Sequence, residues 1–223
     1  MTITQARSGG GSWRVFLIDA HSILRDGLRR LLERERGYHV CGEAESGRTA
    51  ASLIAQTRPD LVIMEIGAPD AKGLKIIKRL RVRFPRLRVL VLSMYNKTLY
   101  AERALKAGAK GYVMKHESWE RLRVAIRQVL GGEIGVSEPI SSRLMSRSVS
   151  RRNGSSRHLR SLSDRELEIV DGIGQGMATR EIARCLGISA KTVEAHRGNI
   201  RRKLGLHSGP ELMRFALASR TGG

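Results

Sequence analysis

Short apolar runs alternate with amphipathic stretches over the first 130 residues. Five runs have the composition of buried strands: 15–18, 40–44, 61–64, 88–93 and 111–114. Apolar residues recur at helical spacing in 22–36, 47–57, 74–84, 99–107 and 119–130. Strands that alternate with helices and are apolar throughout are typical of a parallel sheet covered on both faces. The pattern therefore predicts an α/β domain over 13–135 with a doubly wound five-stranded parallel sheet, after a disordered tail over 1–12.

Polar residues stand directly after four of the apolar runs: Asp19, Glu65, Ser93 and Lys115. Doubly wound sheets place their ligand site at the carboxyl ends of the strands, where the strand order reverses. We therefore expect these four side chains to share one edge of the sheet and to carry the chemistry of this domain.

Residues 136–160 read as a Ser/Arg-rich linker, since 141–160 contain seven Ser and six Arg with almost nothing apolar. Beyond it, 161–223 read as an all-α domain of four helices. The first helix follows Ser163 and Glu166, which have the spacing of a capping box. The other three are expected at the ranges 179–186, 190–204 and 211–219.

The middle two of these helices have the arrangement of a helix-turn-helix, with a tight turn over 187–189 between a short helix and a longer basic one. At 100° per residue, Val193, Ile200 and Leu204 share the side that faces the core. The opposite side and its flanks should enter the major groove of DNA. The expected contact residues are Lys191, Thr192, Glu194, Ala195, His196, Arg197, Gly198, Arg201, Arg202 and Lys203.

The basic members of this set are expected to bind phosphates, while the small side chains on the outer side of the helix are expected to meet base edges. Ala195 suits a thymine methyl group, and His196 suits either the helix edge or a phosphate. Two interpretations of Glu194 stay open: it accepts from a cytosine amino group, or it interacts with the helix dipole in the first turn.

The formal net charge of +20 favours a polyanionic partner. Double-stranded DNA suits the helix-turn-helix pattern, whereas RNA is disfavoured because only 4% of the residues are aromatic. No apolar run is long enough for a membrane span, and 1–12 lack the apolar stretch of a signal peptide. We therefore expect a cytoplasmic protein that does not bind membranes.

The sequence LSDRELEIVDGIGQGMATREIARCLGISAKTVEAHRGNIRRKLGL resembles the LuxR-type DNA-binding domain over almost its whole length. VFLIDAHSILRDGL, PDLVIMEIGAPDAKGL, VLVLSMY and AGAKGYVMKHES resemble the receiver domain of two-component response regulators. Together they resemble the NarL/FixJ class, which implies a CheY-like receiver, a transcription regulator rather than an enzyme, and a homodimer on DNA.

In receivers, two acidic residues after the first strand hold Mg²⁺, an Asp after the third strand accepts a phosphoryl group, and a Ser/Thr and a Lys bind its oxygens. By this resemblance the chain keeps Asp19, Ser93 and Lys115, and Tyr112 takes the aromatic switch position. It departs at Ala20, in place of the second acid, and at Glu65, in place of the phosphoacceptor. The resemblance thus implies a degenerate phosphorylation pocket.

The two departures predict weak or absent Mg²⁺ binding, with no other cofactor, because one oxygen ligand and one negative charge are missing. They also predict a regulator that acts without Mg²⁺-dependent phosphorylation. Glu65 either imitates the phosphorylated state or is a structural remnant. The alternatives are a conventional regulator phosphorylated by a histidine kinase, and a module that titrates a partner protein.

The remaining candidate chemistry is sparse. The six histidines, His21 among them, are scattered without metal-ligand spacing, so no metal site is expected. Cys41 and Cys185 sit in apolar patterns and are expected to be buried thiols.

Overall fold

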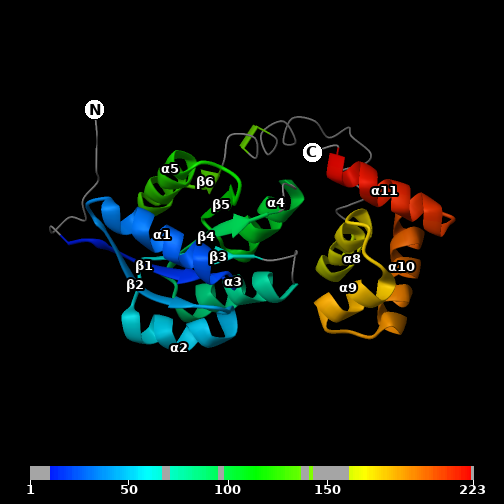
Figure 1. The fold of residues 1–223 in the computed structure, drawn as a ribbon, viewed down its shortest axis with the longest axis horizontal. Helices are drawn as coiled ribbons and strands as arrows, with labels where there is room; N and C mark the ends of the chain where they lie inside the picture. The colour runs from blue at the N-terminus through cyan, green and yellow to red at the C-terminus, as the bar shows by residue number, and fades with distance from the viewer. Residues whose placement is uncertain (1–10, 67–70, 95–97, 137–140, 143–160, 222–223) are drawn as a thin grey trace. The chain divides into compact units, whose positions relative to one another are not determined.

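The computed structural model describes residues 11–66, 71–94, 98–136, 141–142 and 161–221, in two compact units (Figure 1). Most of the predicted tail (1–12) and linker (136–160) lies outside these residues. The first unit is built on one parallel sheet with strand order β2-β1-β3-β4-β5-β6. Its strands are β1 (Trp13–Ile18), β2 (Tyr38–Ala44), β3 (Leu61–Glu65), β4 (Arg88–Ser93), β5 (Gly111–Met114) and β6 (Gly135–Val136). Its helices are α1 (Ser22–Arg34), α2 (Gly47–Thr57), α3 (Ala71–Arg83), α4 (Thr98–Ala107) and α5 (Trp119–Leu130).

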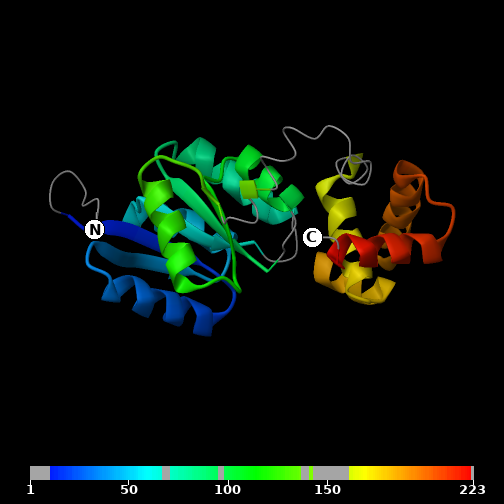
Figure 2. The ribbon, with the colours of Figure 1, turned by 90° about the horizontal axis from the view of Figure 1, so that it is seen from above.

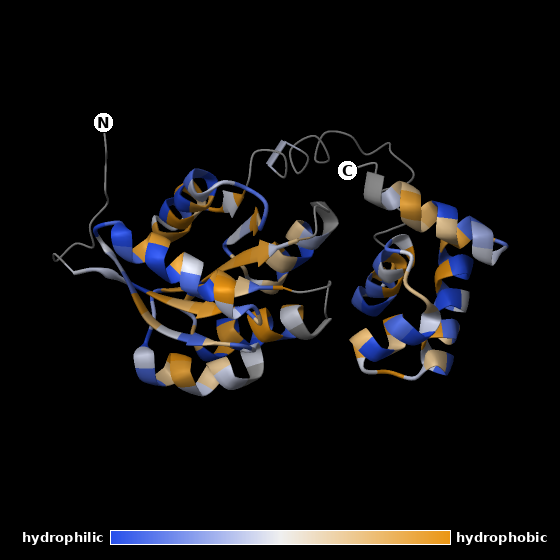
Figure 3. Ribbon diagram, viewed as in Figure 1, coloured by the Kyte–Doolittle hydropathy of each residue, from blue (hydrophilic) through white to orange (hydrophobic). Residues whose placement is uncertain are grey.

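Both faces of the sheet are apolar because successive side chains of a strand point to opposite sides. Figures 1 and 2 show α1 and α5 on one face and α2, α3 and α4 on the other. Val15 and Leu17 of β1 pack with α1 and α5, while the equally buried Phe16 points the other way. Hydrophobic colour accordingly runs along the central strands in Figure 3. The predicted parallel α/β fold is confirmed.

The sheet has one more strand than the sequence predicts. β6 is only two residues long and pairs with β5, Gly111 lying opposite Gly135. A Cβ on Gly135 would lie 2.5 Å from the carbonyl oxygen of Ala125, so only glycine allows this close approach. A strand of this length leaves no apolar run in the sequence, which is why the expected number was five.

The second unit is the predicted set of four helices. They are α8 (Asp164–Gly174), α9 (Thr179–Leu186), α10 (Ala190–Leu204) and α11 (Gly209–Thr221). Ser163 and Glu166 form the capping box: the backbone N–H of Ser163 donates to Glu166 Oε2 (2.7 Å), and that of Glu166 donates to Ser163 Oγ (3.3 Å). Gly187 ends α9 with a positive φ of 62°, which starts the tight turn into α10.

Within the residues that the structure covers, no helix is both long and apolar enough to span a bilayer.

Candidate functional site

The carboxyl ends of the central strands bring three of the predicted side chains into contact. Asp19 follows β1, Glu65 ends β3 and Lys115 follows β5. The Lys115 Nζ lies 2.7 Å from Asp19 Oδ2 and 2.5 Å from Glu65 Oε1. These contacts join the two neighbouring strands β1 and β3 to β5 across the edge of the sheet. We call Asp19, His21, Glu65 and Lys115 the strand-end cluster.

The ion pairs in this cluster are buried: the exposed fractions of the Asp19, Lys115 and Glu65 side chains are 4%, 8% and 11%. Burial, the largest influence, opposes ionisation of Asp19. The polar contacts of Asp19 with Glu65, Lys115 and the backbone of His21 outweigh the effect of burial and lower the pKa of Asp19. Asp19 is therefore ionised at neutral pH and holds the ammonium of Lys115.

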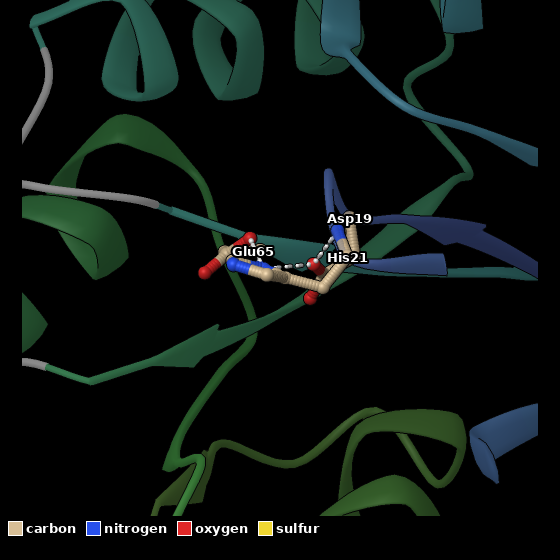
Figure 4. A group of neighbouring side chains, drawn as sticks. All are labelled: Asp19, His21 and Glu65. Carbon is tan, nitrogen blue, oxygen red and sulfur yellow. Dashed lines mark hydrogen bonds and ion pairs between the residues drawn. The ribbon is translucent and has the colours of Figure 1, made fainter. Parts of the chain in front are cut away.

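His21 belongs to the cluster, although its sequence spacing gave no such signal. Its Nδ1 lies 3.0 Å from Asp19 Oδ1 and 3.4 Å from Glu65 Oε2. Its backbone N–H also donates to Asp19 Oδ1 (2.8 Å). Figure 4 shows the imidazole between the two carboxylates. Each carboxylate therefore presents one oxygen to Lys115 and the other to His21.

A buried arginine supports the same loop. Arg25, in the first turns of α1, is 8% exposed and donates through its guanidinium to the backbone carbonyl of Asp19 (2.6 Å). Its Nε lies 3.8 Å from Glu43 Oε2, which Arg29 also contacts at 2.9 Å. Arg25 thereby fixes the main chain that carries Asp19. The helical pattern of the sequence gave no reason to expect a buried charge at this position.

Three further positions come from the resemblance to receivers. Ser93 is buried and its hydroxyl donates to the carbonyl of Ile66 at 3.4 Å, a long contact. Tyr112 on β5 is fully buried at 1% exposure. Ala20 is exposed and brings no ligand atom to the site.

In the second unit, α9 and α10 have the packing that the helical pattern predicts. Val193 and Ile200 are fully buried, Leu204 is 8% exposed, and they share a core with Ile182 and Leu186. Lys191, Ala195 and Arg202 are exposed on the opposite side of α10. A Cβ on Gly198 would meet nothing within 4 Å, so this face is open. The small residues Ala195 and Gly198 therefore allow a ligand to approach this side of the helix closely.

Three of the predicted DNA contacts, Glu194, Arg197 and Lys203, are engaged within the domain. Thr179 donates its hydroxyl to Glu194 Oε1 (2.7 Å) and accepts from Arg197 (2.9 Å), which joins α9 to α10. Lys203 Nζ donates to the buried Glu166 Oε2 (2.7 Å). These side chains fix the angle between the helices, whereas Thr192 is exposed and shares a hydrogen bond with Ser189 at the start of α10. His196 and Arg201 are half-buried.

The pair of Lys203 and Glu166 predicts a measurable effect on stability. Lys203→Met should lower the free energy of unfolding by about 1–2 kcal/mol, less than for a fully buried pair because Lys203 is 38% exposed. Burial raises the pKa of Glu166, but Lys203 and the Ser163 backbone outweigh it, so the pKa stays below 4.5. The contribution is thus present above pH 4.5 and lost as the pH falls through the lowered pKa.

Urea unfolding of the full chain between pH 3 and 7, about the range that titrates this carboxyl, measures this effect. The control is Glu181→Gln, which alters the exposed counterpart of Glu166 at the start of α9 and should change little. Equal unfolding free energies for the wild type and Lys203→Met would contradict the assignment.

The cysteine prediction is wrong for Cys185, which is exposed on α9, while Cys41 is half-buried on β2. Burial raises the pKa of the Cys41 thiol, which makes it a poor nucleophile. α9 is amphipathic and its apolar side is already filled by Ile182 and Leu186, so Cys185 faces outward.

Comparison with known proteins identifies both units. Residues 15–127 match the response regulator receiver domain, and 160–216 match the bacterial regulatory proteins of the luxR family. The oxygen regulatory protein NreC of Staphylococcus aureus (strain bovine RF122 / ET3-1) is 35% identical over 209 residues, covering 92% of this chain and 96% of NreC. RcsB from Salmonella enterica serovar Typhimurium, solved bound to promoter rprA in the presence of phosphomimetic BeF3⁻, is 25% identical with a TM-score of 0.65.

That RcsB structure covers 93% of this chain and 99% of its own. A second RcsB structure, of two dimers bound to two parallel DNAs, is also 25% identical, covers 94% and 99% of the two chains, and has a TM-score of 0.57. The matched families account for the sheet unit and for the four-helix unit in turn. The chain therefore belongs to the NarL/FixJ class of response regulators, DNA-binding regulators in which a receiver domain precedes a LuxR-type helix-turn-helix domain.

Proposed function

We propose that this protein is a transcription regulator that binds promoter DNA as a homodimer and acts without aspartyl phosphorylation. The observation that carries the second part is the 2.5 Å ion pair between Glu65 and Lys115. Glu65 stands where the family has its phosphoacceptor, and its carboxylate already satisfies the lysine that would bind phosphoryl oxygens. RcsB, a relative of the same class, is found on promoter DNA and as dimers on DNA, which supports the first part.

The donor set of the cluster does not fit the Mg²⁺ ion that the family implies. Mg²⁺ prefers oxygen ligands in near-octahedral geometry. Here Ala20 offers none, the two carboxylates each give one oxygen to Lys115, and His21 presents a nitrogen. Asp19, Glu65 and Lys115 sum to a formal charge of −1, whereas the family's three acids and one lysine sum to −2. Phosphoryl transfer relies on the metal to neutralise developing charge, so phosphorylation is disfavoured.

Glu65 is proposed to take the place of the phosphorylated residue. Its carboxylate is one methylene further from the main chain than that of Asp, and it already contacts the ammonium of Lys115 without any phosphoryl group. In the proposed state, the carboxylate of Glu65 supplies the negative charge that phosphorylation would otherwise add at this position. Regulation then falls to protein concentration, a partner or a ligand, and the receiver is assigned no catalytic role.

The DNA part is tested by the specificity and salt dependence of binding. Untreated full-length protein should select promoter fragments from a genomic library and bind them about 10³-fold or more tightly than random DNA. A protein that only titrates a partner would retain DNA by charge alone, with a steep dependence on salt and no preference of sequence. That second result would overturn the proposal.

Restoring the acids should restore the family's chemistry. The double variant Ala20→Asp/Glu65→Asp regains three carboxylates, and Ala20 is exposed, so the new side chain has room. With Mg²⁺ and a small phosphodonor such as acetyl phosphate, intact-mass measurement should find one phosphoryl group on the double variant. The wild type should gain none, and phosphorylation of the wild type would contradict the proposal.

A further inference from the structure

The helices on one face of the receiver sheet carry a large excess of positive charge. Residues 71–88, which form α3 and the turn and strand start after it, contain eight Lys or Arg and no Asp or Glu. Over α2, α3 and α4 together, nine basic residues accompany one acid, Glu102, whereas α1 and α5 on the other face have seven to three (Figures 1 and 2). On that other face Arg29 and Arg123 pair with carboxylates, at 2.9 and 3.1 Å.

The basic side chains of α3 point to solvent because the apolar ones pack on the sheet. Ile77 and Leu80 are buried, at 0% and 3% exposure. Apart from Val82, the exposed positions among the described side chains of the helix are basic: Lys75, Lys78, Arg79, Arg81 and Arg83.

The positive surface continues onto the turn between α4 and β5. A Cβ on Gly108 would lie 2.5 Å from Cδ of Arg81, so the stem of Arg81 packs against this turn. Lys106 and Lys110 stand on either side of Gly108 and are exposed. We call Lys75, Lys78, Arg79, Arg81, Arg83, Lys106 and Lys110 the α3 basic surface. Within the described part of the chain, none of these seven side chains pairs with a carboxylate.

This concentration of charge is unfavourable for the helix itself. Lys75 lies four residues before Arg79, which lies four before Arg83, and like charges at this spacing destabilise a helix. Arg81 and Arg83 are in the last turn, where the helix dipole favours cations, but Lys75 and Lys78 lie outside that turn. A polyanionic partner would remove the repulsion.

We propose that the α3 basic surface binds the phosphate backbone of double-stranded DNA, as a second contact that is separate from α10 and independent of sequence. The 13 residues of α3 make a helix about 20 Å long, and duplex DNA carries about twelve phosphates over that length. A receiver joined to a DNA-bound domain is held near such phosphates at a raised effective concentration. The inference rests on the DNA-binding part of the proposed function and not on the role of Glu65.

Other polyanions fit this surface less well. A helix that lies in a membrane interface exposes an apolar side, but Val82 is the one large apolar residue that is exposed among the described side chains of α3. Proteins that bind single-stranded RNA stack its bases on aromatic rings. Phe84, the aromatic residue that follows α3, is half-buried, and the guanidinium of Arg83 lies over its ring at 5.5 Å.

The test is the triple variant Lys75→Gln/Lys78→Gln/Arg79→Gln of the full-length protein. Each lost phosphate contact lowers the slope of log affinity against log salt by about 0.9, so the slope should fall by about 2–3. Affinities for a promoter fragment with flanking DNA and for random DNA of the same length should fall by the same factor, about tenfold or more. Flanking DNA should strengthen binding of the wild type relative to a fragment trimmed to the selected site, and the triple variant should lose this gain.

The matched control is Arg30→Gln/Arg34→Gln/Arg36→Gln, which removes three exposed charges from α1 and the turn after it. It has the same net charge as the triple variant, but it should keep the gain from flanking DNA and most of the salt slope. Glutamine is a good helix former, and the triple variant also loses like-charge repulsion. Its urea midpoint should therefore equal or exceed that of the wild type, which excludes loss of fold as the cause.

Two results would overturn the proposal. One is that the triple variant and the control have the same affinities and salt slopes, which would make the effect one of net charge. The other is that the triple variant keeps the gain from flanking DNA but loses binding to phosphatidylglycerol vesicles that the wild type binds, which would assign the surface to a membrane. A wild type without promoter preference would count against the proposed function instead, and the salt slopes on random DNA would still decide this inference.

Discussion

Glu65→Gln is expected to weaken promoter binding by untreated full-length protein by at least about tenfold, which equals about 1.4 kcal/mol. Glutamine has the size of glutamate but lacks the charge that pairs with Lys115 at 2.5 Å. Lys115 would keep only Asp19 as its anionic partner, and the charge that replaces phosphorylation would be gone. Fluorescence anisotropy with a labelled promoter fragment measures the loss.

The matched control is Glu35→Gln. Glu35 likewise pairs with a basic side chain, Arg123 at 3.1 Å, but it is 25% exposed and lies outside the strand-end cluster. It should bind DNA like the wild type. If Glu65→Gln also binds normally while remaining folded, Glu65 is a structural remnant and the receiver acts by other means.

Ala195→Glu should abolish sequence-specific binding. Ala195 is exposed in the middle of α10, beside the open face at Gly198, so a glutamate there would meet base edges or phosphates with a negative charge. Loss of base contacts costs about 1–3 kcal/mol each, and added repulsion from DNA increases the effect. Glutamate is a good helix former, so the fold of α10 should be kept.

Ser52→Glu adds the same charge at an exposed position of α2, in the receiver. It controls for the change in net charge and should reduce affinity only slightly. Promoter affinity and affinity for random DNA are measured for both variants at two salt concentrations. Retained promoter preference in Ala195→Glu would mean that α10 does not read the bases.

The order of strands and helices could be predicted because strands that are buried on both faces of a parallel sheet appear in the sequence as continuous apolar runs. The same logic brought Asp19, Glu65 and Lys115 together, since residues that follow parallel strands meet at one edge. It also placed Val193 and Ile200 in the core of the helical domain, because a helix with one buried side repeats its apolar residues at a fixed angle.

Other features depend on side-chain geometry that a pattern does not contain. His21 joins the cluster because its ring turns back onto Asp19, two residues before it, and a search for spaced histidines misses such a contact. Helical spacing grouped Ile23 with the apolar residues of α1, yet Ile23 is 87% exposed while Arg25 is buried. Arg25 is stabilised there by the carbonyl of Asp19, a long-range partner that the helix alone does not reveal.

The recognition helix shows the same limit. A helical wheel assigns Lys203 to the DNA because it is basic and lies near other basic residues. In the structure its ammonium contacts Glu166, a buried residue that belongs to the capping box of α8. Glu194 is similarly occupied by Thr179, which favours a role in holding α9 against α10.

The most direct measurement is promoter binding by untreated full-length protein in EDTA, compared with the same protein in Mg²⁺ and acetyl phosphate. Residues 161–223 alone serve as the reference for a DNA-binding domain without a receiver. We expect the full-length protein to select the same sites as the fragment, at least as tightly, and to gain nothing from Mg²⁺ and the phosphodonor. Binding by the full chain only after treatment with the phosphodonor would contradict phosphorylation-independent action. Binding by the fragment alone would contradict the proposal that Glu65 takes the place of the phosphorylated residue, because the receiver would then be inhibitory.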